Sequence, residues 1–154
     1  MTLGEMRFLV HGPAVSLADI MRTEDVLGCR FPDDYRRFFL RFNGGRSVPC
    51  ESKHYGLTMT FWFAITESDR LPVYSIVLAN RHAGEELKGA FCILGETAGG
   101  LYLVMRMRRP GLHRIGVWNH EEDEVADAEL VFAGLTDMLS HMVHVERIVV
   151  PEGR

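Results

Sequence analysis

The sequence has few cysteines and no cysteine pairing pattern. Its 154 residues contain three, Cys29, Cys50 and Cys92, which are widely spaced and form no CxxC pair. An odd, scattered set argues against a disulfide framework or a cysteine-rich zinc site, and it fits a reducing cytosol. No nucleophile motif surrounds any of them. We expect Cys50 to be the exposed thiol, and Cys29 and Cys92 to be buried and inert.

Long apolar runs and an excess of positive charge are also absent. No stretch approaches the roughly 20 apolar residues of a membrane-spanning helix. Residues 1–12 mix charged with apolar side chains, which is not typical of a signal peptide. The net charge of −4 gives no general basic character for nucleic acid. We expect a cytoplasmic protein that binds neither membranes nor nucleic acid directly.

The composition is that of an ordinary globular domain. Hydrophobic residues make up 47% and charged residues 25% of the chain, which is long enough to bury a core. No repeat, linker or low-complexity region divides it. We expect one domain over residues 1–154, with its core at about 16–145.

The clearest helix signal lies in residues 31–45. Pro32 suits a first helical turn, where its missing N–H costs nothing, and Asp33 and Asp34 favour the same turn electrostatically. The large apolar side chains fall on one face at helical spacing: Tyr35, Phe38, Phe39 and Phe42. Residues that tolerate a left-handed conformation then end the helix: Asn43, Gly44 and Gly45. This face must lie against a substantial core.

The other elements follow from capping signals and hydrophobic period. Ser16 and Asp19 form a variant capping box before a helix at 17–27. We expect strands at 48–52, 58–65, 91–94, 101–107 and 115–120, a turn at 54–56, a short helix within 69–81 and a closing helix at 130–143. Residues 6–10 are a strand or an ordered arm, and 147–150 are a candidate short strand. This order predicts an α+β fold, in which two N-terminal helices and a C-terminal helix pack on an antiparallel sheet and leave its other face partly open.

Three motifs in order resemble the SUKH superfamily. The first is carried by Leu27, Gly28, Phe31, Pro32, Asp34, Tyr35, Phe38, Phe39, Asn43, Gly44 and Gly45. The second is the segment 93–102 with Gly95, Gly99 and Gly100, and the third is 115–120. The resemblance spans about residues 17–139. It implies an α+β domain found in bacterial immunity proteins against polymorphic toxins and in some regulators, whose members are not known as enzymes.

The candidate metal and phosphate motifs are incomplete. His141 and His144 are spaced to share one face of the last predicted helix, but two histidines fall short of a zinc site, and there is no HExxH. Gly95, Gly99 and Gly100 lie between two predicted strands without a following helix or Lys-Ser/Thr, so a hairpin turn is expected rather than a phosphate loop. We expect no metal and no cofactor.

The charge distribution is uneven. Acidic residues crowd one stretch without any Lys or Arg: Glu121, Glu122, Asp123, Glu124, Asp127 and Glu129. Such a run is either a solvated loop or a surface for a basic partner, such as a nuclease with a nucleic-acid groove. A basic turn opposes it, with Arg106, Arg108, Arg109 and Arg114. The pattern permits a nuclease partner without specifying one.

Aromatic residues lie close to the acidic stretch. Tyr102 and Trp118 fall on the two strands that flank the Pro110-Gly111 turn. They are interface anchors if they share the open sheet face, but Trp118 is equally compatible with the core. The expected partner-binding surface comprises Tyr102, Trp118, His120, Glu121, Glu122, Asp123 and Glu124.

The resemblance favours a non-catalytic module that holds a partner protein, most simply an immunity protein that occludes a toxin's active site. One alternative is a small-ligand-binding domain or enzyme with a histidine-lined pocket, in which His54, His82 or His120 meets a carboxylate. A self-associating scaffold, paired through the open face or an edge strand, is another. Monomer and homodimer both remain open.

Overall fold

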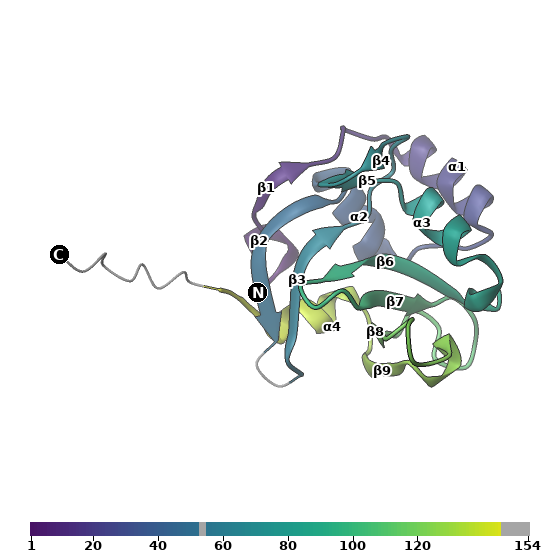
Figure 1. Ribbon diagram of the computed structural model, residues 1–154. Coiled ribbons are helices and arrows are strands. Elements are labelled where there is room, and N and C mark those ends of the chain that lie inside the picture. The colour runs from purple at the N-terminus through teal and green to yellow at the C-terminus, as the bar shows by residue number, and fades with distance from the viewer. Residues whose placement is uncertain (53–54, 146–154) are drawn as a thin grey trace.

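One large antiparallel sheet, with helices packed behind it in the view of Figure 1, makes up most of the protein. The computed structural model describes residues 1–52 and 55–145. The α-helices are α1 (Leu17–Leu27), α2 (Asp33–Arg41), α3 (Ile76–Ala83) and α4 (Leu135–Ser140). The strands are β1 (Phe8–His11), β2 (Gly45–Ser52), β3 (Leu57–Trp62), β4 (Asp69–Arg70), β5 (Val73–Tyr74), β6 (Phe91–Thr97), β7 (Tyr102–Arg106), β8 (Ile115–Trp118), β9 (Glu129–Phe132) and β10 (Met142–His144). Three short 3-10 helices are η1 (Leu3–Glu5), η2 (Gly84–Leu87) and η3 (Val125–Asp127).

The sheet has eight strands in the order β1-β2-β3-β6-β7-β8-β9, and β10 pairs with β2 beyond the end of β1. Every pair in it is antiparallel. β4 and β5 form a separate two-stranded sheet. Among the described residues, three helices have seven or more residues, α1, α2 and α3. The predicted α+β class is therefore confirmed.

Both N-terminal helices form as the sequence predicts. The Ser16 side chain accepts a bond from the Asp19 amide, and the Asp19 carboxylate accepts one from the Ser16 amide, so the capping box is complete. Gly28 ends α1 with φ 68°, a left-handed conformation that glycine adopts without strain. The buried face of α2 carries Tyr35, Phe38 and Phe39. The Phe38 ring lies 5.3 Å from that of Trp62 on β3, which anchors the helix to the sheet.

A buried carboxylate joins α1 to α2. The Glu24 side chain is 1% exposed and accepts bonds from Arg36 Nε, from the second Arg36 nitrogen and from the Phe31 amide, at 2.8, 2.8 and 3.0 Å. Three donors satisfy a charge that would otherwise be costly to bury. This bond set fixes the angle between the two helices.

The predicted closing helix at 130–143 is wrong, because three elements occupy that range. Leu130 and Phe132 belong to β9, the helix α4 spans only Leu135–Ser140, and β10 follows. The period of the apolar residues changes from two to helical spacing at the Ala133-Gly134 turn, so two elements together resemble one helical stripe in the sequence. Asp34 of α2 accepts bonds from the Thr136 amide and hydroxyl at 3.0 and 2.8 Å. A residue 102 positions earlier in the chain therefore caps α4.

The predicted short helix within 69–81 forms, but it starts only at Ile76 and runs on to Ala83. Residues 69–70 and 73–74 form the β4–β5 hairpin, and the helix starts at Ile76, where the Ser75 side chain accepts a bond from the Leu78 amide. The 6–10 segment contains strand β1, and the predicted strand at 48–52 is the end of the longer β2. The predicted turn residue His54 and the candidate strand at 147–150 lie outside the described residues.

Backbone crowding explains the glycine pair after α2. Gly44 and Gly45 both have positive φ, and a Cβ added to them would stand 2.6 and 2.2 Å from the backbone oxygens of Phe63 and Val10. Asn43 sits beside them and donates to the Pro13 and Ile65 carbonyls while accepting from the Ile65 amide. This turn leads from α2 into the sheet at a point where three segments meet.

Candidate partner-binding surface

Three strands bring Glu96, Tyr102 and Trp118 into one row. Tyr102 on β7 is the direct register partner of Glu96 on β6 and of Trp118 on β8. Side chains at paired positions of neighbouring strands share a face of the sheet. Glu96 and Tyr102 are half-buried on that face, whereas Trp118 is only 1% exposed.

Trp118 supports the surface from beneath. The sequence left its exposure open, and the structure places it in the core, where its indole Nε1 donates to the Asp123 carbonyl at 2.9 Å. This bond holds the loop after β8 over the indole ring. Trp118 is therefore not available as an exposed interface anchor, although it positions the residues that are.

Tyr102 and His120 form the aromatic part of the surface. Their rings stack with centroids 4.3 Å apart and planes at 25°. Both residues are half-buried and keep an accessible edge. Phe63 extends the cluster, with its ring 6.5 Å from Tyr102 and 5.7 Å from Tyr74.

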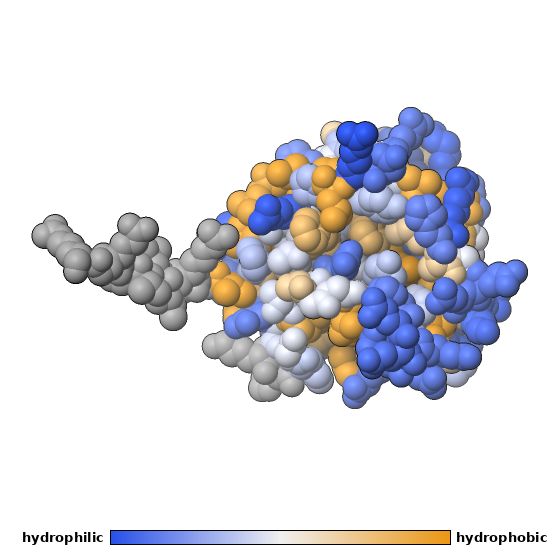
Figure 2. Space-filling model, viewed as in Figure 1, coloured by the Kyte–Doolittle hydropathy of each residue, from blue (hydrophilic) through white to orange (hydrophobic). Residues whose placement is uncertain are grey.

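The acidic residues that follow His120 are exposed. Glu121, Glu122, Asp123 and Glu124 all face solvent, and none of their carboxylates forms an ion pair with any residue in 1–52 or 55–145. Glu122 accepts one bond from the Asn119 amide group at 3.1 Å. Figure 2 shows hydrophilic side chains crowded over the region where Figure 1 places β8 and β9. The negative charge of this loop is therefore not neutralised within the described fold.

Two further carboxylates join this surface, and the sequence did not reveal them. Glu86 of η2 lines one hollow together with Trp118, Asp123 and Glu124. Partial burial, with smaller effects from Glu96, Tyr74 and Glu86, raises the pKa of the Tyr102 hydroxyl. Because the strand register and the path of η2 create these neighbours, no local sequence signal could have found them.

The histidines do not gather in the way the alternative hypothesis requires. His82 bonds to the Tyr74 hydroxyl at 3.3 Å, His120 stacks on Tyr102, and His54 lies outside the described residues. His141 and His144 do not share a helix face, since His141 follows the end of α4 and His144 belongs to β10. In the described part of the chain, no group of three or more His, Cys, Asp or Glu side chains is placed to hold a metal ion.

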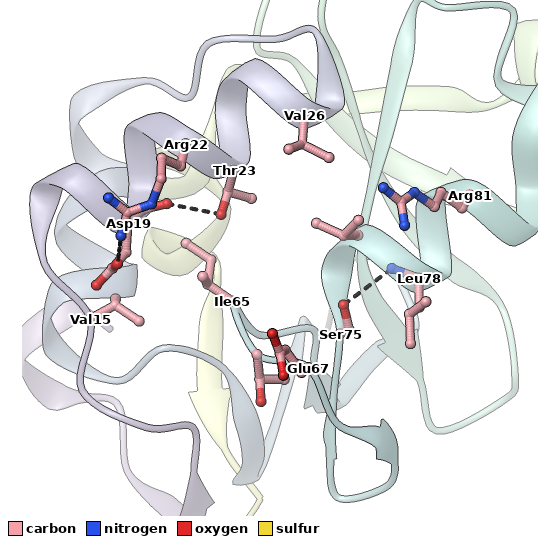
Figure 3. Close-up of a pocket in the computed structure, with 12 residues that line it drawn as sticks. Val15, Asp19, Arg22, Thr23, Val26, Ile65, Glu67, Ser75, Leu78 and Arg81 are labelled. Atoms are coloured by element: carbon pink, nitrogen blue, oxygen red, sulfur yellow. Dashed lines mark hydrogen bonds and ion pairs between the residues drawn. The ribbon is translucent and has the colours of Figure 1, made fainter.

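A groove between α1 and α3 was also not foreseen (Figure 3). It encloses about 580 Å³ and has Val26 and Arg22 on one wall and Leu78 and Arg81 on the other. Arg22 is paired with Asp19 on its own helix. The groove contains no histidine, so it is not the histidine-lined pocket of the alternative hypothesis.

Two of the four arginines around the turn between β7 and β8 donate hydrogen bonds to backbone carbonyls of the same fold. Arg106 donates to the Pro110 carbonyl at 2.7 Å, and Arg114 donates to the Leu130 carbonyl at 2.9 Å. Arg108 and Arg109 remain exposed. The molecule is thus polarised along β8, with the basic turn before the strand and the acidic loop after it.

The expected exposure is wrong for two of the three cysteines, Cys50 and Cys29. Cys50 is 1% exposed, and burial raises the pKa of its thiol to about 12. Cys92 is buried as expected, but Cys29 is partly exposed. The alternating pattern of β2 places Cys50 on its inner face, while Cys29 lies in the open turn between α1 and α2.

Comparison with known proteins places the chain in a family. The sequence model of the SMI1 / KNR4 family (SUKH-1) matches residues 14–141. A search of curated proteins gives no match. No helix within residues 1–52 and 55–145 is long and apolar enough to span a membrane.

Proposed function

The chain belongs to the SMI1 / KNR4 family (SUKH-1), a family of immunity proteins for polymorphic toxins that are generally non-catalytic, and we propose that it binds and neutralises one such toxin. Neutralisation is by occlusion, in which the bound protein covers the toxin's active site or substrate groove. The contact surface is Tyr102 and His120 together with the exposed carboxylates of Glu121, Glu122, Asp123 and Glu124.

The observation that carries this choice of surface is the set of carboxylates without counterions. An exposed acidic patch beside an aromatic pair fits a partner that presents Lys or Arg side chains. Toxins that cut nucleic acid carry such basic grooves, because they must neutralise phosphates. Opposite charge also accelerates encounter, which suits an inhibitor that must act before its toxin does damage.

The loop is held in place before any partner arrives. The bond from Trp118 to Asp123 and two backbone bonds from residues 122 and 123 to the Asn119 carbonyl fix its path. A preformed loop loses less conformational freedom on binding, so more of the contact energy appears as affinity.

The test is titration of the protein, at low and high salt, with any toxin domain that a gene next to its own encodes. The double variant Glu121→Lys/Glu124→Lys should bind at least about tenfold more weakly at low salt, and the difference should shrink at high salt. The matched control reverses two exposed carboxylates just before and in strand β4, Glu67→Lys/Asp69→Lys, and should change affinity less than about twofold.

Two measurements, binding affinity and inhibition of toxin activity, show whether the chosen surface or the immunity role itself is wrong. The wild-type protein should abolish toxin activity at a one-to-one ratio, and its acidic-loop variant should need an excess. Equal affinity of wild type and acidic-loop variant would reject this surface while leaving immunity intact. Absence of any complex with the toxin would reject the immunity role itself.

A further inference from the structure

Cys29 and Cys92 meet at the junction of α1, α2 and β6. Cys29 follows Gly28, which ends α1, and Cys92 is the second residue of β6. Both line one hollow of about 190 Å³, together with Asn80 and Gly89. Two thiols from distant parts of the sequence therefore share a single small space.

The two cysteines share the hollow but differ in access. The neighbouring Cys29 side chain, and then burial, raise the pKa of the Cys92 thiol, which donates to the Ile93 carbonyl at 3.7 Å. The Cys92 residue is 3% exposed, whereas Cys29 is partly exposed. A reagent from solvent therefore meets the Cys29 sulfur first, and Cys92 stands behind it.

Cationic groups lie at this hollow. Arg81 lines it. Arg30 donates to the Cys29 carbonyl at 3.0 Å, although its guanidinium is also paired with the Asp25 carboxylate at 2.9 Å. Arg108 lies against Gly89, since a Cβ placed there would be 3.2 Å from its guanidinium. The buried carboxylate of α1, Glu24, is paired with Arg36. Partly exposed thiols in electropositive surroundings are the ones that react with oxidants.

We propose that Cys29 and Cys92 form an oxidation site for small peroxides, in which Cys29 reacts first and then forms an intramolecular disulfide with Cys92. This site is separate from the acidic loop and does not depend on the proposed toxin partner.

The chemistry balances with hydrogen peroxide as the oxidant. The Cys29 thiolate attacks one peroxide oxygen, the O–O bond breaks, and the released hydroxide takes a proton to become water. Cys29 is then a sulfenic acid. The Cys92 sulfur attacks the Cys29 sulfur, the S–O bond breaks, and the Cys92 proton leaves with the hydroxide as a second water. The two thiols supply the two electrons that the peroxide accepts.

The product would link the turn between α1 and α2 to the sheet. This turn contains Gly28, Phe31 and Pro32, and the Glu24 bond set lies beside it. A disulfide here would close the small hollow and hold the helix pair against β6. Thioredoxin-type reductants would reverse it by thiol–disulfide exchange.

The test treats the purified protein with hydrogen peroxide and measures intact mass and free thiols. Wild type should become about 2 Da lighter and lose two of its three thiols, and dithiothreitol should restore both. Cys50→Ser is the matched control and should lose the same 2 Da, since Cys50 takes no part. Cys29→Ser should show no loss of mass at matched peroxide exposure.

A second variant shows whether a failure to form the disulfide comes from misfolding or from the missing thiol. Cys92→Ala places no hydroxyl in the core, and its circular dichroism spectrum verifies the fold. In this variant Cys29 should accumulate as a sulfenic acid that dimedone traps, or go on to sulfinic acid, about 32 Da heavier. Wild type that gains this mass at Cys29, that forms only disulfide-linked dimers or that does not react would overturn the proposal.

Discussion

Two sets of carboxylates in this protein differ in whether the fold supplies their hydrogen-bond donors. Glu24 is buried, and three donors from Phe31 and Arg36 satisfy it. Glu121 and its neighbours are exposed and have no counterion in the described residues. A carboxylate whose donors lie inside the fold stabilises it, whereas one without donors remains available to another molecule. We expect the effect of removing a carboxylate to be largest at the buried Glu24 and smaller at the half-buried Asp34 and Asp19.

The largest effect is expected at Glu24. Glu24→Ala leaves the Arg36 guanidinium and the Phe31 amide without their acceptor, and should lower the free energy of unfolding by about 3–5 kcal/mol. Urea denaturation followed by circular dichroism measures this. The double variant Glu24→Leu/Arg36→Met, which removes both charges, should recover much of the loss. If the double variant is as unstable as the single one, the unpaired charge is not the cause.

An intermediate effect is expected at Asp34, which has one internal partner residue. Asp34→Ala removes the acceptor for the Thr136 amide and hydroxyl, and should cost about 1–2 kcal/mol, the usual range for a lost helix cap. The same urea experiment measures it. The neighbouring exposed Asp33→Ala should cost less. Equal losses at both positions would show that helix-dipole effects on α2, rather than the cap of α4, explain Asp34.

The smallest effect is expected at Asp19, which is half-buried in the α1 capping box. Bonds from the Ser16 amide and hydroxyl, with Arg22 nearby, hold the pKa of Asp19 below its ordinary value of 3.8. A lowered pKa in the folded state stabilises the fold above the ordinary pKa, and this contribution is lost as the pH falls through the folded value.

The urea midpoint of wild type should therefore exceed that of Asp19→Asn slightly at neutral pH, and the two midpoints should converge in acid. A difference that stays constant with pH would show that charge is not involved. Asp25→Asn, at an exposed carboxylate outside the capping box, is the matched control.

Local signals predicted the N-terminal half of the fold well. The capping box at Ser16, the aromatic face of α2 and the glycines after it are each contained within a few residues. Such signals depend on backbone conformation and helical spacing, which a sequence displays directly.

Long-range features could not be predicted in this way. The change of period near Gly134 looked like one continuous helical stripe, and only the pairing of β9 with β8 distinguishes it. Glu86 and Glu96 reach the Tyr102 surface through strand register and the course of η2. The acidic loop itself was visible in the sequence, but the burial of Trp118 beneath it was not.

The bond from Trp118 to the acidic loop also gives the protein an internal optical reporter. The chain has two tryptophans, and the other, Trp62, lies beneath α2 and donates to the Ser47 hydroxyl at 3.2 Å. Anything that displaces the loop changes the hydration of the Trp118 indole and leaves that of Trp62 as it was. In a Trp62→Phe variant, the remaining tryptophan fluorescence comes from Trp118 and reports on the acidic loop. The rate at which a partner binds this loop can then be measured without attaching a dye.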